Sequence, residues 1–218
     1  LIDGFKTSQR KIIYTCFKRK LTKEVKVAQL SGSVSEISEY HHGESSLVGA
    51  IIKLAQEYVG SNNLNPLYPG GQFGTRLRGG KDSASERYIY TLLSPITRKL
   101  FPQSDDNILT YLNDDGLSVE PIFYAPIIPM ILVNGTKGIG TGFSTEVLSY
   151  NPSDIIDYLY NKLSGADAMT KSPEFIPYYE GFRGTVSKLD THKYLMKGRY
   201  EVLSEDKVRI TELPVGMW

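Results

Sequence analysis

Residues 8–40, SQRKIIYTCFKRKLTKEVKVAQLSGSVSEISEY, hold the pattern that decides the predicted fold. Apolar residues recur at helical spacing over 8–21 and form one face, whereas basic residues occupy the opposite face. Thr7 or Ser8 is expected to cap the start of this helix. The expected buried face comprises Ile12, Ile13, Cys16, Phe17 and Leu21.

Further helices are predicted on the C-terminal side of this segment. We expect a second short helix over 23–30, a turn at Ser31-Gly32-Ser33 and a third helical stretch over 34–40. Two short helices around a glycine-containing turn predict a helix-turn-helix. Residues 44–59 form the clearest helix, because their apolar residues fall at helical spacing.

A glycine-rich region without helical or strand periodicity follows, from Gly60 to Asp82. So long a loop is uncommon in a compact domain and usually has a function. Residues 86–93 fit either a helix or a strand, and 94–101 are expected to be helical until Pro102.

From Val119 onward the pattern changes to β-branched and aromatic residues between proline and glycine. A helix over 153–163, capped by Ser153, interrupts these strands. The change near residue 116 predicts an α+β chain with two domains, 1–116 and 117–218. The expected strands are Val119–Phe123, Pro129–Val133, Gly184–Lys188, Tyr194–Leu203 and Val208–Leu213.

Composition excludes several classes of protein. The chain has 218 residues, of which 40% are hydrophobic and 22% charged, as in soluble globular proteins. Its longest apolar stretch, Tyr124 to Val133, is broken by two prolines and falls far short of the about 20 residues that a membrane-spanning helix needs. The single cysteine, Cys16, excludes an internal disulfide and a multi-cysteine zinc site, and we expect a buried thiol.

The net charge of +1 conceals an asymmetry along the chain. Residues 1–26 contain eight basic and two acidic residues, a net charge of +6, whereas 89–218 contain twelve basic and sixteen acidic residues, a net charge of −4. This asymmetry hints at a polyanion-binding N-terminal part, although such a run is also typical of a solvated helix face. The sequence starts at Leu1 with no charged-then-apolar leader in view, and we expect it to be part of a longer protein.

Two glycine-rich motifs do not fit nucleotide sites. Residues 74–81 fail the P-loop pattern, because Thr75 stands where glycine is needed and Asp82 where Ser or Thr is needed. Residues 138–142 lack the dinucleotide-binding spacing and the surrounding strand–helix unit. The adjacent His41 and His42 lack acidic residues at metal-ligand spacing, so a structural or phosphate-contacting role is favoured over a metal site.

Arg87-Tyr88 is the pair with the clearest chemical potential. It follows a loop that contains Arg76, Arg78 and Lys81, so the tyrosine lies in a positive field, although most tyrosines are simply packed. Nearby cations favour the phenolate, which is the stronger nucleophile. A guanidinium stabilises the extra charge of a phosphorane, and glycines let backbone amides approach a phosphate. These residues predict a tyrosine nucleophile that attacks a phosphodiester.

Nine segments form an ordered set of motifs along nearly the whole chain. They are LIDGFK (1–6), QRK (9–11), KVAQL (26–30), YHHGE (40–44), GSNN (60–63), FGTR (73–76), GGKD (79–82), RYI (87–89) and NGTKGIGTG (134–142). Together they resemble the breakage-reunion region of type IIA DNA topoisomerases. Ser61-Asn62-Asn63 and Gly80-Lys81-Asp82 make the resemblance closer to eukaryotic-type topoisomerase II than to bacterial gyrase A subunits.

The resemblance implies a winged-helix (helix-turn-helix) DNA-cleavage domain over 1–116 and the N-terminal part of a mixed α/β tower domain over 117–218. It implies that Tyr88 is the nucleophile, that Arg87 assists transition-state charge and that His42 acts at the scissile phosphate. Ile139 matches the isoleucine that wedges between base pairs and bends the DNA, and such a wedge has a physical rationale. The remaining expected DNA contacts are Lys6, His41, Arg76 and Lys81.

The implied activity is ATP-dependent double-strand cleavage through a 5′-phosphotyrosyl link, strand passage and religation by a homodimer on double-stranded DNA. The resemblance implies Mg²⁺ and ATP as cofactors, both held outside these residues, and no metal site within them. It implies that the protein is located in the nucleus, or in a viral or cytoplasmic replication compartment if its source is a virus. It also implies that the protein does not bind a membrane. Two departures, Thr7-Ser8 for Pro-Gly and Phe143 for Trp, do not touch the chemistry.

Two alternatives compete with this interpretation. A catalytically silent relative that bends DNA needs none of Arg87, Tyr88 and His42, whose joint presence argues against it. A tyrosine recombinase shares none of the motifs.

Overall fold

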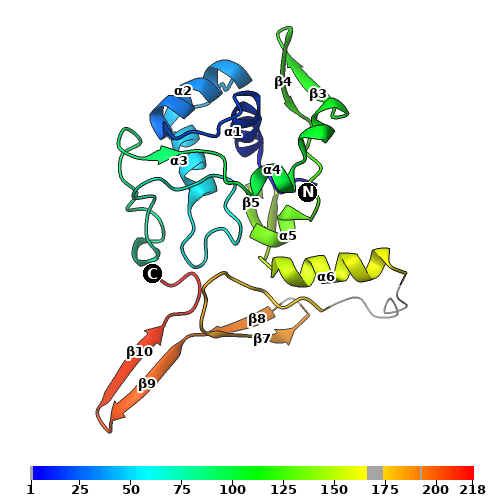
Figure 1. Cartoon of the computed structure of the whole chain (residues 1–218). Coiled ribbons are helices and arrows are strands. Elements are labelled where there is room, and N and C mark those ends of the chain that lie inside the picture. Colours follow the sequence, from blue (N-terminus) through cyan, green and yellow to red (C-terminus); the bar gives the residue numbers. More distant parts are fainter. Residues whose placement is uncertain (1, 166–173, 192) are drawn as a thin grey trace.

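The computed structural model describes residues 2–165, 174–191 and 193–218 (Figure 1). The described part is a mixed α/β structure whose first helices pack together and whose strands pair in antiparallel two-stranded ladders. No helix in this part is long and apolar enough to cross a membrane.

The described helices fall mainly in the first two thirds of the chain, with two 3-10 turns at Arg76–Arg78 and Gln103–Asn107. The α-helices are α1 (Thr7–Lys18), α2 (Val27–Ser38), α3 (Glu44–Ala55), α4 (Thr97–Leu100), α5 (Met130–Asn134) and α6 (Pro152–Leu163).

Each described strand pairs with one antiparallel neighbour. The pair β1–β2 joins distant segments, and the other pairs are hairpins. The strands are β1 (Val25–Lys26), β2 (Tyr90–Thr91), β3 (Tyr111–Asp114), β4 (Leu117–Pro121), β5 (Thr136–Gly140), β6 (Phe143–Val147), β7 (Thr185–Asp190), β8 (Lys193–Lys197), β9 (Arg199–Ser204) and β10 (Lys207–Glu212).

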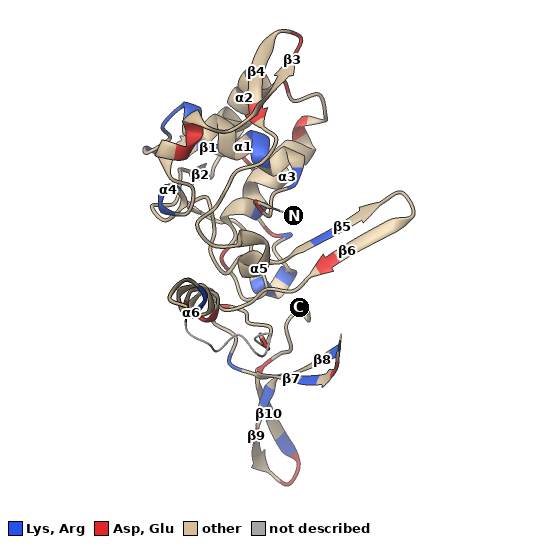
Figure 2. Cartoon of the chain, turned by 90° about the vertical axis from the view of Figure 1, so that its right-hand side faces the viewer, with Lys and Arg blue, Asp and Glu red and all other residues tan. Residues whose placement is uncertain are grey.

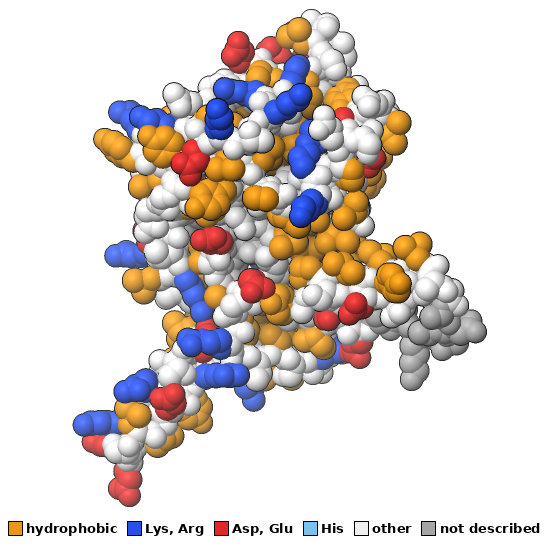
Figure 3. All heavy atoms as spheres, viewed as in Figure 1, with side chains coloured by type: hydrophobic (Ala, Val, Ile, Leu, Met, Phe, Trp, Pro, Cys, Tyr) orange, Lys and Arg blue, Asp and Glu red, His pale blue; other side chains and the backbone are white. Residues whose placement is uncertain are grey.

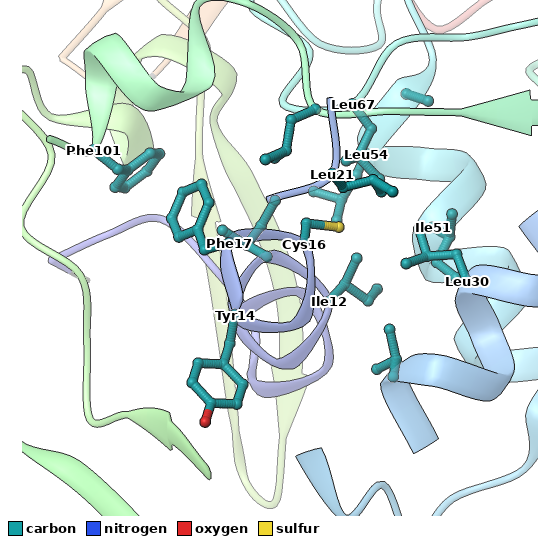
Figure 4. Packing of buried hydrophobic residues seen from close by; sticks show 14 of the residues in the cluster. Ile12, Tyr14, Cys16, Phe17, Leu21, Leu30, Ile51, Leu54, Leu67 and Phe101 are labelled. Carbon is teal, nitrogen blue, oxygen red and sulfur yellow. The ribbon is translucent and has the colours of Figure 1, made fainter. Parts of the chain in front are cut away.

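The core lies between α1, α2 and α3, whose apolar faces meet (Figure 4). Ile12, Leu30 and Ile51 are fully buried there. Cys16 is buried as predicted, and this burial raises the pKa of its thiol to about 12. The same cluster continues past residue 116, and its last buried member is Ile155.

A buried carboxylate anchors the N-terminal segment to the core. Asp3 is fully buried, and its Oδ2 accepts a hydrogen bond from Arg10 Nε at 2.7 Å. The backbone amides of Phe5 and Tyr124 also donate to this carboxylate, each at 3.0 Å. One side chain therefore joins the segment before α1, α1 itself and the segment after β4.

A second buried ion pair links α1 to β4. Lys11 Nζ donates to Glu120 Oε2 at 2.8 Å and also to the carbonyl of Ser38 at the end of α2. The buried side chain of Asn63 also joins distant segments of the chain. Its Nδ2 donates to the carbonyl of Val133 at 2.8 Å, and its Oδ1 accepts from the amide of Glu180 at 2.8 Å.

The predicted helix-turn-helix at 23–40 is wrong in its details. Residues 31–33 lie inside the continuous helix α2, and residues 25–26 form a strand. Ser31 is fully buried against the core, whereas Gly32 lies on the exposed side of α2, where a Cβ would meet nothing within 4 Å. These small residues therefore continue the helix and do not mark a turn. Helix α1 ends at Lys18, three residues early, because Lys20 adopts a positive φ of 48°.

The capping residues also differ from those predicted. Neither Thr7 nor Ser8 caps α1; the amide of Lys6 donates instead to Gln9 Oε1 at 2.9 Å. Helix α6 is capped by Asn151 in place of the expected Ser153, whose amide donates to Asn151 Oδ1 at 2.9 Å. The predicted helix over 44–59 is confirmed but ends at Ala55.

The strand predicted at Pro129–Val133 is wrong, because these residues begin helix α5. A short apolar run fits a helix or a strand equally well, and Pro129 stands at the N-cap of α5, where its missing amide donor removes no hydrogen bond of the helix. The strand predicted at Tyr194–Leu203 is two strands that meet at Gly198, whereas the other expected strands are confirmed within a few residues.

We predict that Asp3→Asn lowers the free energy of unfolding by about 3–5 kcal/mol, because it leaves the guanidinium of Arg10 buried without a counter-charge. The matched control is Glu146→Gln in the exposed pair Lys137–Glu146, which should cost less than about 1 kcal/mol. Urea unfolding of both variants gives the comparison. Equal small losses would contradict the anchoring role of Asp3.

Candidate functional site

Tyr88 lies on the surface of a fixed turn. Its side chain is 76% exposed, and Arg87 beside it is also exposed. The next residue, Ile89, is 1% exposed and belongs to the core. The amide of Tyr88 donates to the carbonyl of Ser85 at 2.9 Å. A phenol that points to solvent is thus attached to a backbone held by a buried neighbour.

The first turn of α2 fixes this backbone on both sides of the tyrosine. The amide of Ala28 donates to the Glu86 carbonyl at 3.1 Å, and the amide of Val27 donates to the Ile89 carbonyl at 3.0 Å. Amides in a first helical turn have no partner within their own helix, so these bonds satisfy both groups. Tyr88 therefore has a defined position although its ring is exposed.

Two glycines allow a second segment to approach the same backbone. Gly70 and Tyr90 exchange two backbone hydrogen bonds, at 2.9 and 2.8 Å. A Cβ on Gly70 would lie 2.9 Å from the Tyr90 carbonyl oxygen. Gly71 has a φ of +115°, and its Cβ would lie 3.2 Å from Ile89 Cγ2. The glycines predicted to form a functional loop here serve close backbone packing around the tyrosine.

The preceding part of the loop is closed on itself. Thr75 donates to Asp82 through its amide at 2.8 Å and through its hydroxyl at 2.6 Å, and these bonds lower the pKa of the Asp82 carboxyl. Gln56 Nε2 donates to the carbonyls of Phe73 and Gly80 at 2.8 and 3.0 Å. We call residues 72–88 the tyrosine loop, since these contacts give it one shape.

The basic residues of the tyrosine loop differ in their surroundings. Arg78 and Lys81 are exposed. Arg76 is partly buried, and its guanidinium bonds to the Glu212 carboxylate and, at 2.7 Å, to the Leu213 carbonyl. Lys and Arg side chains also gather over the helical N-terminal part on the face shown in Figure 3.

The two histidines lie just before α3, and both are exposed. His41 Nε2 lies 3.1 Å from Asp114 Oδ2 at the end of the β3–β4 hairpin. The ring of His42 meets the ring of Tyr40 edge-on, with centroids 5.5 Å apart. In the described ranges no three His, Cys, Asp or Glu side chains gather as a metal site.

The β5–β6 hairpin projects from the body of the molecule (Figure 2). Ile139 near its tip is 90% exposed, and Phe143 opposite Gly140 is 82% exposed. Lys6 lies against the middle of β5, because its Cε is 4.0 Å from the position of a Cβ on Gly138. The structure thus brings Lys6 and Ile139 to the same hairpin.

Sequence patterns missed this hairpin and its exposed Lys137, and Phe143 was noted only as a departure from the resemblance. The two-residue connection Thr141-Gly142 was the available signal, since a short glycine-containing link between strands is typical of a hairpin. Gly142 has a φ of +76°, which such a turn requires.

A family model that describes the A subunit of DNA gyrase/topoisomerase IV matches residues 1–218. The chain belongs to this family. DNA topoisomerase 2 of Bombyx mori is 55% identical over 100% of the chain, and DNA topoisomerase 2 top-2 of Caenorhabditis elegans is 52% identical over the same span. The chain spans 14% of the length of each of these relatives.

A solved structure agrees with membership of this gyrase/topoisomerase IV family. The crystal structure of the Plasmodium falciparum topoisomerase II DNA-binding, cleavage and re-ligation domain matches with a TM-score of 0.96 and 47% sequence identity. The match covers 100% of this chain and 29% of that chain. The resemblance to type IIA topoisomerases is thereby confirmed, as is the mixed α/β character of the fold.

For this family member we predict that Gly74→Ala opens the tyrosine loop, because a Cβ there would lie 2.6 Å from the Gly80 carbonyl oxygen at a φ of +103°. Trypsin should then cut faster after Arg76, Arg78 and Lys81, as followed by mass spectrometry. Gly32→Ala, where a Cβ meets nothing within 4 Å, is the control. Unchanged cleavage rates at these sites would show that the loop tolerates the side chain.

Proposed function

We propose that this chain is the DNA-cleaving part of a type IIA topoisomerase and that Tyr88 is its nucleophile. The observation that supports this most is the exposed Tyr88 ring on a backbone fixed by α2 and by the buried Ile89. A structural tyrosine would be packed, and a tyrosine on an unfixed loop would have no defined direction of attack. Family membership and the name of the Plasmodium falciparum domain point the same way.

The proposed step exchanges one phosphate ester for another. The Tyr88 phenol gives up its proton to solvent as its Oη forms a bond to phosphorus and the bond to the 3′ oxygen breaks. That oxygen takes up one proton from solvent and leaves as a hydroxyl, so no net proton is gained or lost. The DNA then carries a 5′-phosphotyrosyl link. Arg87 stabilises the added charge of the phosphorane, and His42 acts at the same phosphate. Attack by the 3′ hydroxyl reverses the step and reseals the strand.

The proposed DNA contacts are of two kinds, charged contacts with phosphates and an apolar contact between base pairs. Lys6, His41 and Lys81 are exposed and would contact backbone phosphates. Ile139 would enter between base pairs, because an apolar wedge unstacks a step and bends the duplex. The DNA contact of Arg76 stays a prediction, since its guanidinium bonds within the protein here.

We also propose the division into a winged-helix domain over 1–116 and the start of a tower domain over 117–218. The three-helix group α1–α3 with the β1–β2 ladder supports the first. Only the later part of 117–218 supports the second. Among described residues, the hairpins β7–β8 and β9–β10 add no buried member to the core cluster, whereas Tyr124 and residues up to Ile155 belong to it.

Strand passage by a homodimer in the nucleus belongs to the same proposal, as does the use of Mg²⁺ and ATP by the whole protein. Among the described residues no three His, Cys, Asp or Glu side chains gather at one place, and the proposed step uses side chains of this chain alone. Such a metal would supply further charge stabilisation at the phosphate.

We predict that Tyr88→Phe in the full-length protein abolishes the covalent protein–DNA adducts that denaturant traps, because the attacking oxygen is gone, and leaves DNA affinity within about twofold. Tyr90→Phe is the matched control, since Tyr90 is also exposed and lies two residues away. Adducts that persist in Tyr88→Phe, or that vanish only in Tyr90→Phe, would show that another group attacks.

We predict that Ile139→Ala reduces the DNA bend angle, measured by energy transfer between dyes at the duplex ends, because the wedge is lost. The control Ile108→Ala removes a similarly exposed isoleucine elsewhere and should leave the bend unchanged. Tyr88 adducts should still form in both variants. A bend unchanged by Ile139→Ala argues against the wedge.

A further inference from the structure

Glu212, at the end of β10, is a buried carboxylate between two arginines. Its side chain is 2% exposed. Arg76 of the tyrosine loop binds one of its oxygens, and Arg183 Nε lies 3.3 Å from the other. Burial would raise the pKa of Glu212, but the hydrogen bonds from Arg76 and Arg183 outweigh it and lower this pKa. The carboxylate therefore stays charged, and its removal leaves Arg76 without its buried partner.

The chain around Glu212 also packs against the same turn of the loop. Arg76 Nη2 donates to the Leu213 carbonyl at 2.7 Å. A Cβ on Gly79 would lie 2.7 Å from Trp218 Nε1, and the Trp218 ring meets Tyr58 edge-on at 5.8 Å. The C-terminal end of the chain consequently lies beside this part of the loop (Figure 1).

The turn held by Glu212 is continuous with the segment that bears the tyrosine. The amide of Gly80 donates to the Thr75 carbonyl at 2.8 Å, and Thr75 is bound to Asp82. The amide of Ala84 then donates to the Gln72 carbonyl at 2.9 Å. A shift at Arg76 thus changes contacts that extend to within four residues of Tyr88.

We propose that Glu212 is a positioning residue for Tyr88, which acts through Arg76 and links the β9–β10 hairpin to the tyrosine loop. This inference rests on the proposed cleavage function. In this proposal Arg76 acts through its ion pair with Glu212 and does not contact a DNA phosphate directly. The two roles of Arg76 differ in what they do to DNA affinity.

The test uses Glu212→Gln, Arg76→Gln and the double variant in the full-length protein. A misplaced nucleophile lowers the single-turnover cleavage rate, and we expect a loss of about tenfold or more in each single variant. The double variant should lose no more than the worse single variant, because both remove one interaction. DNA affinity, and its dependence on salt, should stay unchanged in all three.

Matched variants keep the result specific. Glu201→Gln removes a carboxylate of the same hairpin that faces Arg209 at 3.6 Å in an exposed pair, and it should leave the cleavage rate unchanged. Glu212→Asp keeps the charge on a shorter side chain and should recover part of the rate. It also replaces Glu212→Gln in the comparison if that variant does not fold.

Two results in DNA binding and cleavage would overturn the proposal. One is a weaker DNA affinity in Arg76→Gln with a salt slope reduced by about one, which would show a phosphate contact. The other is rate losses that multiply in the double variant. Amide hydrogen exchange is measured on the same variants, and Glu212→Gln should speed the exchange of the amides at 75–82. If the unsubstituted protein forms no adducts, the proposed function fails, whereas unchanged exchange at 75–82 refutes the link itself.

Discussion

The site depends on one constraint, which is that the first free amides of α2 bond to carbonyls on both sides of Tyr88. A group that must attack a large substrate has to be exposed, yet exposure usually brings freedom of movement. Here the exposure of the ring and the fixing of the backbone are provided by different parts of the structure. The backbone at Glu86 and Ile89 is fixed by helix amides, and only the ring reaches solvent. Orientation is thereby provided before any substrate binds, which is the condition for efficient attack.

This arrangement also determines where a phosphate can bind. A helix N-terminus is often an anion site because its amides are free, but the amides of Val27 and Ala28 in α2 are already used. The positive charge predicted near Tyr88 would therefore come from side chains, among which Arg87 and Lys81 are exposed. Side chains adjust to a bent duplex better than a rigid helix end does, which suits recognition through the DNA backbone and its deformability.

Local patterns predicted the parts of the fold that local physics decides. The face of α1 and the later hairpin strands follow periodicity, and the exposed Arg87-Tyr88 pair was found from its neighbours along the chain. Tertiary packing decided the rest. By sequence alone Ser31-Gly32-Ser33 is typical of a turn, yet these residues lie inside helix α2. The pattern of Pro129–Val133 fits both a strand and a helix, and the structure has a helix there. The partner of Arg76 lies 136 residues away, so no local pattern could supply it.

The segments that form the site are widely separated in the sequence, and buried polar side chains hold them together. Asp3 fixes the segment that ends at Lys6, and Asn63 joins the chain after α3 to the end of α5, from which the Ile139 hairpin starts. A purely apolar core tolerates small shifts between elements, whereas a buried carboxylate or amide with several partners does not. The distance between Ile139 and Tyr88, the proposed wedge and nucleophile, is accordingly set by buried residues that lie away from both, and in our proposal Glu212 extends the same principle to the tyrosine loop.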